Sequence, residues 1–99
     1  MSLHYAFTLY VAGQTSRSEQ AIANLRRLCK EALAGFTCEI AVVDVLTDPE
    51  SAEERRILAT PTLIKESPAP LRRITGDLSD MGRVLTGLAL SPFPSGDAR

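Results

Sequence analysis

Residues 57–80 read ILATPTLIKESPAPLRRITGDLSD, and this stretch gives the clearest indication of the architecture. Two short runs that are candidates for strands, residues 62–64 and 71–75, flank a proline-rich segment. Proline is a common turn residue, so the two runs predict a β-hairpin. Prolines are tolerated beside strands better than inside them. The prolines that flank or separate these runs are Pro61, Pro68 and Pro70.

A strand, a helix and a second strand are predicted upstream of the hairpin. Residues 3–12 alternate large apolar side chains with others, a period of two that is typical of a strand. The helix is expected to begin at Ser16, which fits a capping box with Glu19, and to end before Gly35. Residues 37–46 contain a β-branched run that predicts a largely buried strand. Because a helix connects the two strands, they are expected to be parallel.

Two further helices complete the predicted order of elements. Asp48 and Pro49 favour a helix start, and this helix is expected to reach about Leu58. The last helix begins near residues 79–80. The resulting α/β order, β-α-β-α-β-β-α, is the thioredoxin-like layout. In that fold the proline before the third strand is commonly cis, which predicts a cis Thr60–Pro61 bond.

Length and composition restrict the class of protein. The 99 residues are expected to form a single domain over residues 1–90, followed by a flexible tail over residues 91–99. Hydrophobic residues are 44% and charged residues 23%, an ordinary globular composition. The net charge of −1 argues against a nonspecific nucleic-acid binder. No apolar run approaches the roughly 20 residues that cross a bilayer, and no leader peptide is visible, so a cytoplasmic protein is expected.

The sequence holds few groups for catalysis or metal binding. Cys29 and Cys38 do not form a disulfide framework, and with His4 as the one histidine they make no recognisable metal site. A Cys–His pair stays open as an alternative, although Cys29 lies on an apolar helix stripe. A thioredoxin-like redox site needs cysteines where the first helix starts, and residues 13–18, GQTSRS, contain none. Neither an enzyme nor a cofactor is therefore expected.

Five blocks of the sequence resemble the KaiB family, small circadian-clock proteins of cyanobacteria. The blocks follow one another in the family's order and spacing: LYVAG at 9–13, VVDVL at 42–46, DPESAEE at 48–54, ILATPTL at 57–63 and RRITGDLSD at 72–80. The resemblance implies a non-enzymatic regulator that binds the KaiC ATPase ring and promotes its dephosphorylation. Through KaiC it implies contact with KaiA or with a clock-output histidine kinase. A diverged thioredoxin-like binding module in stress adaptation or kinase sensing is the alternative.

The resemblance also implies two possible folds. One is the thioredoxin-like monomer, and the other is a tetrameric ground state with the order β-α-β-β-α-α-β, in which the chain is refolded from about Asp48. We expect the thioredoxin-like monomer to dominate. Pro92 and Pro94 fit badly in the last strand of the ground state, and Ala89 is expected to favour continuation of the last helix.

Specific residues follow from the same resemblance. The first helix, the second strand and the hairpin supply the partner-binding candidates, for which solvated surface charge is the alternative: Arg26, Arg27, Glu39, Ala41, Lys65, Arg72 and Arg73. The positions that we expect to act in the fold switch or as cis prolines are Pro61, Pro68, Pro70, Gly87 and Ala89.

Overall fold

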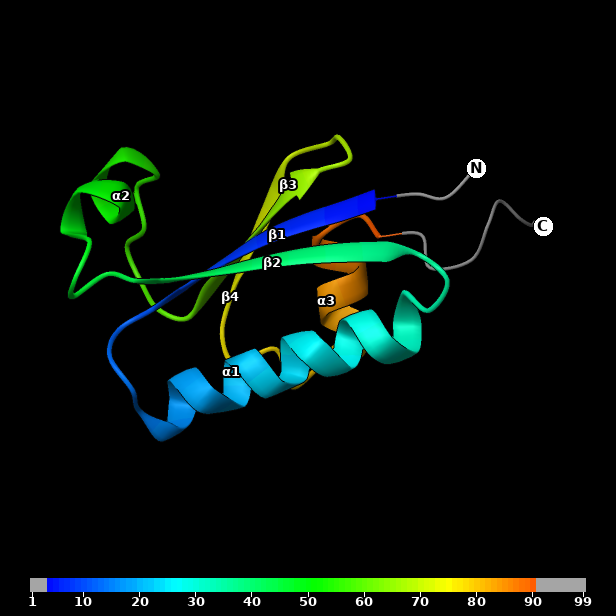
Figure 1. Ribbon diagram of the computed structural model, residues 1–99, viewed down its shortest axis with the longest axis horizontal. Helices are drawn as coiled ribbons and strands as arrows, with labels where there is room; N and C mark the ends of the chain where they lie inside the picture. Colours follow the sequence, from blue (N-terminus) through cyan, green and yellow to red (C-terminus); the bar gives the residue numbers. More distant parts are fainter. Residues whose placement is uncertain (1–3, 91–99) are drawn as a thin grey trace.

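The order of elements agrees with the thioredoxin-like prediction. A computed structural model describes residues 4–90 of the chain. Its elements are β1 (His4–Val11), α1 (Ser16–Arg27), η1 (a π-helical turn, Leu28–Ala32), β2 (Thr37–Asp44), α2 (Pro49–Glu54), β3 (Thr62–Ser67), β4 (Arg72–Thr75) and α3 (Met81–Gly87) (Figure 1). The predictions for Pro92 and Pro94 lie outside the described residues.

The four strands form one sheet in the order β2-β1-β3-β4. β1 and β2 are parallel, as the helical crossover predicted. β3 pairs antiparallel with β1 and with β4, so the predicted hairpin is confirmed, with Thr62 opposite Thr75. The sheet therefore combines a parallel half with an antiparallel half, and β2 and β4 are its edges.

The core lies between one face of the sheet and the two helices α1 and α3, which lie on the same side of it (Figure 1). Alternate residues of β1 point into this core because side chains alternate along a strand. Tyr5, Phe7, Leu9 and Val11 are all buried. They pack in one cluster with buried residues of the helices, β3 and β4, among them Leu25, Leu28, Leu63, Ile74, Val84 and Leu88.

The start of α1 differs by one residue from the prediction. Thr15, not Ser16, is the N-cap, because its backbone is extended (φ −111°, ψ 167°) and its hydroxyl accepts the N–H of Ser18 at 3.1 Å. Ser16 is already helical, so the predicted capping box with Glu19 is wrong. At the other end Gly35 has φ +91°, which confirms the left-handed residue expected after the helix.

The prediction that the second strand is largely buried is wrong. Val42 of β2 is 45% exposed, and most of the strand is half-buried or exposed. β2 has a neighbouring strand on one side only. Cys38 and Ile40 pack against the core cluster near the start of the strand, whereas the part that follows does not.

The helix after Asp48 is shorter than predicted. Asp48 is the N-cap and accepts the N–H of Ser51, as expected, but α2 ends at Glu54 and does not reach Leu58. Arg56 has φ +54°, its N–H donates to the carbonyl of Glu53, and the N–H of Ile57 donates to the carbonyl of Ala52. These two bonds form a Schellman motif, which satisfies the last carbonyls and stops the helix.

The last helix ends in the same way. Asp80 caps α3 by accepting the N–H of Arg83. Ala89 has φ +53°, its N–H donates to the carbonyl of Thr86, and the N–H of Leu90 donates to that of Leu85. The prediction that Ala89 continues the helix is therefore wrong, because the left-handed backbone at this position ends it.

The three prolines of the hairpin region all follow a cis peptide bond. The Thr60–Pro61 bond is cis, as predicted. The Ser67–Pro68 and Ala69–Pro70 bonds are cis as well.

Candidate partner-binding site

The predicted residues of α1 and β2 lie on opposite sides of the sheet. Glu39 pairs with Ala6 and Ala41 pairs with Thr8, so both side chains are on the face that α1 does not cover. Arg26 and Arg27 are exposed on α1, on the other side of the sheet. The fold therefore does not gather these four residues into one patch: Arg26, Arg27, Glu39 and Ala41.

Lys65 is buried rather than exposed on the hairpin. It pairs with Phe7 in the sheet and so faces the core, where it is 1% exposed. Its Nζ donates to the carbonyl of Ala89, just past the end of α3, at 3.3 Å. Burial, and then the charge of Arg72, lower the pKa of Lys65. In this fold the ammonium group joins β3 to the end of α3 and is not available to a partner.

Arg73 is exposed, but its guanidinium is engaged within the chain. Nη2 donates to the carbonyl of Arg55 at 2.7 Å and Nη1 donates to that of Arg56 at 3.2 Å. Both carbonyls belong to the segment where α2 ends. Arg72, one residue earlier, is exposed without such a role in the fold, so it is the hairpin arginine best placed for an external partner.

An ion pair holds the end of α2 against β3. Arg55 Nη2 and Glu66 Oε1 are 2.8 Å apart, and the two side chains are 31% and 28% exposed. The hydrogen bond from Arg55 lowers the pKa of Glu66, and a hydrogen bond from Thr8 adds to the effect. Together with Arg73, this pair fixes the position of the loop that follows α2.

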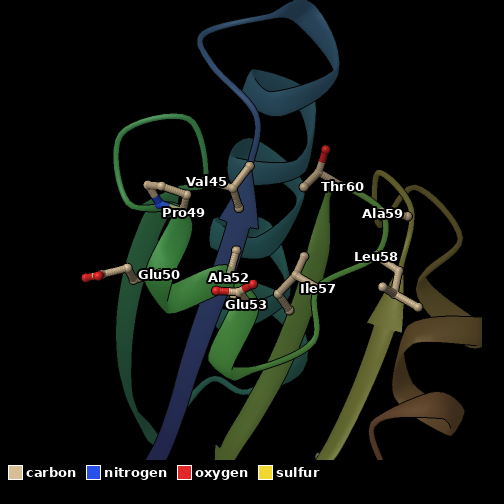
Figure 2. Close-up of a pocket in the computed structure, with 9 residues that line it drawn as sticks. All are labelled: Val45, Pro49, Glu50, Ala52, Glu53, Ile57, Leu58, Ala59 and Thr60. Carbon is tan, nitrogen blue, oxygen red and sulfur yellow. The ribbon is translucent and has the colours of Figure 1, made fainter.

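A hollow of about 590 Å³ opens between α2 and the loop over residues 57–60 (Figure 2). Val45, Ala52 and Ile57 give it apolar walls, and Glu50 and Glu53 of α2 are the carboxylates on its lining. α2 stands in front of the sheet in Figure 2, with α1 behind it. The hollow therefore lies on the face of the sheet opposite the core helices.

Two leucines near this hollow are strongly exposed. Leu58, in its lining, is 96% exposed, and Leu46, just before α2, is 70% exposed. The N–H of Leu46 donates to Asp44 Oδ1, which also accepts the N–H of Gly13, so this turn is fixed to the end of β1. The sequence analysis placed Leu58 inside a helix and so missed the site. The sequence feature that could have indicated this site is the apolar segment over residues 57–60, directly before Pro61.

The residues predicted to govern the fold switch are distributed through the structure. Pro68 and Pro70 lie in the turn between β3 and β4, and Pro61 is buried before β3. Gly87 lets α3 approach β4, because a Cβ there would lie 3.0 Å from Ile74 Cδ1. Ala89 accepts the bond from Lys65. None of these residues lines the hollow.

Two kinds of feature were sought in the described part of the chain: clusters of metal ligands and membrane-spanning helices. Within residues 4–90, no three His, Cys, Asp or Glu side chains are grouped so that they could hold a metal ion. None of the helices over these residues has the length and apolar character needed to cross a membrane. The apolar walls of the hollow and its two carboxylates are suited to contact with another molecule.

Comparison with known sequences gives one consistent result. A sequence model described as the KaiB domain matches residues 8–90. The circadian clock protein KaiB3 of Synechocystis sp. is 50% identical over 84 residues, which cover 85% of this chain and 81% of that protein. The circadian clock oscillator protein KaiB of Prochlorococcus marinus is 51% identical over 86 residues, covering 87% of this chain and 73% of that protein.

Solved structures support the fold. The N-terminal domain of Synechococcus elongatus SasA superposes with a TM-score of 0.73 at 21% identity, covering 90% of this chain and 87% of that one. Mitochondrial thioredoxin 3 from Saccharomyces cerevisiae gives a TM-score of 0.65 at 19% identity, covering 86% of this chain and 76% of that one. At these identities the likeness concerns the fold alone, and it confirms the thioredoxin-like prediction.

Proposed function

The chain belongs to the KaiB family, and we propose that it is a non-enzymatic circadian-clock regulator that binds a KaiC-like ATPase ring and promotes its dephosphorylation. Through the ring it meets KaiA or a clock-output histidine kinase. It acts in the cytoplasm as a thioredoxin-like monomer, with residues 1–90 as the binding domain, while the tail predicted for residues 91–99 lies outside the described residues. Its action needs no cofactor.

The exposed Leu58 beside the hollow is the observation that carries this proposal. Burial of apolar surface favours association, so a leucine held 96% exposed in the lining of a hollow is a candidate for an interface. Leu46, which follows the lining residue Val45 in the sequence, is a second strongly exposed apolar side chain. Glu50 and Glu53 favour a partner surface that presents basic groups beside apolar ones.

The loop is held in place before any partner arrives. Arg73 binds the carbonyls of Arg55 and Arg56, and Arg55 pairs with Glu66, directly before the loop begins. A surface that is already ordered loses less conformational entropy on binding. The thioredoxin-like arrangement thus supplies a preorganised contact surface around Leu58.

Binding of the full chain to a KaiC-like ATPase ring from the same organism tests the proposal. With ATP present, we expect co-elution in size-exclusion chromatography and a measurable Kd by biolayer interferometry. Leu58→Asp is expected to weaken binding at least about tenfold, which corresponds to the loss of about 1.4 kcal/mol. Far-UV circular dichroism should be unchanged, because this side chain is almost fully exposed.

Leu71→Asp is the matched control. Leu71 is 60% exposed and lies directly before β4, away from the residues that line the hollow. We expect its affinity for the ring to stay within about twofold of the wild type, a difference of less than 1 kcal/mol. Equal weakening by both variants would place the contact elsewhere. Absence of any complex with the wild-type chain would favour the alternative of a diverged thioredoxin-like module.

Five of the predicted partner-binding residues can be tested in the same binding assay. Arg72 is the exposed hairpin arginine, and the other four lie on α1 and β2: Arg26, Arg27, Glu39 and Ala41. Because Arg26 and Arg27 lie across the sheet from Glu39 and Ala41, one flat partner surface does not cover all four. Reversing the charge of Arg72, Arg27 or Glu39, one at a time, measures how much the hairpin, α1 or β2 contributes to the affinity for the ring.

A further inference from the structure

A thioredoxin-like redox site lies where the first helix starts. The two cysteines of this chain lie near the other end of α1. Cys29 belongs to η1, which continues α1, and Cys38 is the second residue of β2. The short connection over residues 33–36 brings the helix end back to the start of the strand (Figure 1). Both thiols are free, and both residues are partly buried.

The packing of the sheet turns the two side chains toward each other. Cys38 pairs with Tyr5, a core residue of β1, so its side chain is on the face that α1 and η1 cover. Cys29 lies on the apolar side of η1, and both cysteines pack against the same core cluster. Cys38 is also among the groups that raise the pKa of Cys29, so the two side chains lie within interaction distance.

The two thiols differ in their suitability for nucleophilic attack. Burial raises the pKa of Cys29 to about 12, and the hydrogen bond and charge of Cys38 add to this effect. Cys29 therefore keeps its proton at neutral pH. Burial disfavours the Cys29 thiolate, so the first attack is assigned to Cys38, and Cys29 gives up its proton only as it attacks the oxidised Cys38 sulfur.

We propose that Cys29 and Cys38 form a reversible dithiol–disulfide site that hydrogen peroxide oxidises. The Cys38 thiolate attacks one peroxide oxygen, so that an S–O bond forms, the O–O bond breaks, and hydroxide leaves. The Cys29 sulfur then attacks the Cys38 sulfur, forming the S–S bond and breaking the S–O bond. Water leaves with the proton of Cys29. The proton lost earlier by Cys38 neutralises the hydroxide, so two thiols are oxidised and one peroxide is reduced to two waters.

The disulfide would join η1 covalently to β2. It closes only the loop over residues 29–38, within one helix–strand connection, and leaves the hollow at α2 untouched. The site is therefore independent of the proposed contact at Leu58. Oxidation is expected to raise the thermal midpoint of unfolding, because a cross-link restricts the unfolded chain.

Intact-mass analysis of the full wild-type chain tests the proposal. The reduced, folded protein is treated with stoichiometric hydrogen peroxide and then with iodoacetamide. We expect a monomer that has lost two hydrogens, about 2 Da, and takes up no alkyl group. Dithiothreitol should restore the original mass and the uptake of two alkyl groups. These two are the only cysteines in the sequence, so no other thiol contributes.

Single variants separate attack from resolution. Cys29→Ser retains Cys38 and is expected to accumulate a sulfenic acid that dimedone traps, whereas Cys38→Ser should react at least about tenfold more slowly. A wild-type chain that stays folded and still takes up two alkyl groups after peroxide overturns the proposal. So does a product that is only an intermolecular dimer or a sulfinic acid.

Discussion

Arg73 matches a family motif, but its role in the structure differs from the role that the motif implied. Its position in RRITGDLSD implied contact with a partner. The structure instead directs its guanidinium to the carbonyls of Arg55 and Arg56, at the end of α2. A charge reversal here would disturb the fold and the surface together, so Arg73 is a poor probe of binding.

Replacing Arg73 by alanine is expected to lower the free energy of unfolding by about 1 kcal/mol, the usual contribution of hydrogen bonds at an exposed site. Urea denaturation measures the change. Arg72→Ala is the matched control and should alter stability by less than about 0.5 kcal/mol, because this neighbouring arginine makes no such bonds to the α2 segment. Equal losses for the two variants would contradict the assigned role of Arg73.

The Arg55–Glu66 pair gives the stability an expected dependence on acid pH. The hydrogen bond from Arg55 lowers the pKa of Glu66 in the folded chain below its ordinary value of 4.5. A carboxylate with a lowered folded pKa stabilises the fold above its unfolded pKa, and this stabilisation is lost as the pH falls through the folded value.

We therefore expect the free energy of unfolding of the wild type to fall between neutral pH and the acid side of 4.5. Glu66→Gln removes the titrating group, so it should be less stable at neutral pH and should lose less stability on acidification. Denaturant unfolding at a series of pH values measures both. Parallel curves for the two proteins would show that Glu66 does not contribute.

At the scale of elements, the presence and order of the helices and strands were predictable from the sequence. The residues at which the helices end were not. Capping signals such as Asp48 and Asp80 are local, and they identified two helix starts. The ends of α2 and α3 depend instead on left-handed backbone at Arg56 and Ala89. Neither residue is the glycine that marks such an end in a sequence, so both helices were expected to be longer.

The substitution Ala89→Gly is expected to stabilise the described fold by about 1 kcal/mol. A left-handed backbone is unfavourable for alanine and costs glycine nothing. Thermal and urea unfolding measure the gain. Ala41→Gly is the control: Ala41 lies in β2, where glycine should be destabilising. A loss of stability for Ala89→Gly would contradict the left-handed position.

The exposure of β2 was not predictable because it depends on strand order. Its β-branched residues have the composition of a central strand, yet β2 is an edge. Strand order follows from pairings between distant segments, such as β1 with β3. A periodic pattern in one segment carries no information on such pairings.

At the scale of the whole molecule, the order of elements was enough to predict the thioredoxin-like fold, but not the candidate site. The hollow combines Val45, the α2 helix and the loop at Leu58, which meet only after the chain has folded. The burial of Lys65 depends likewise on its pairing with Phe7. The proximity of Cys29 and Cys38 depends on the packing of both residues against the same core cluster. Features that need three-dimensional contacts were missed, whereas features carried by local residues were found.

The hollow, the role of Arg73 and the burial of Lys65 all depend on the thioredoxin-like arrangement of the second half of the chain. Backbone chemical shifts of the full isolated chain, measured by NMR, test this arrangement directly. Residues 62–67 are expected to have the shifts of a strand, residues 49–54 those of a helix, and residues 81–87 those of a second helix. Helical shifts across residues 62–67 in the dominant species would contradict the arrangement and, with it, the proposed contact surface.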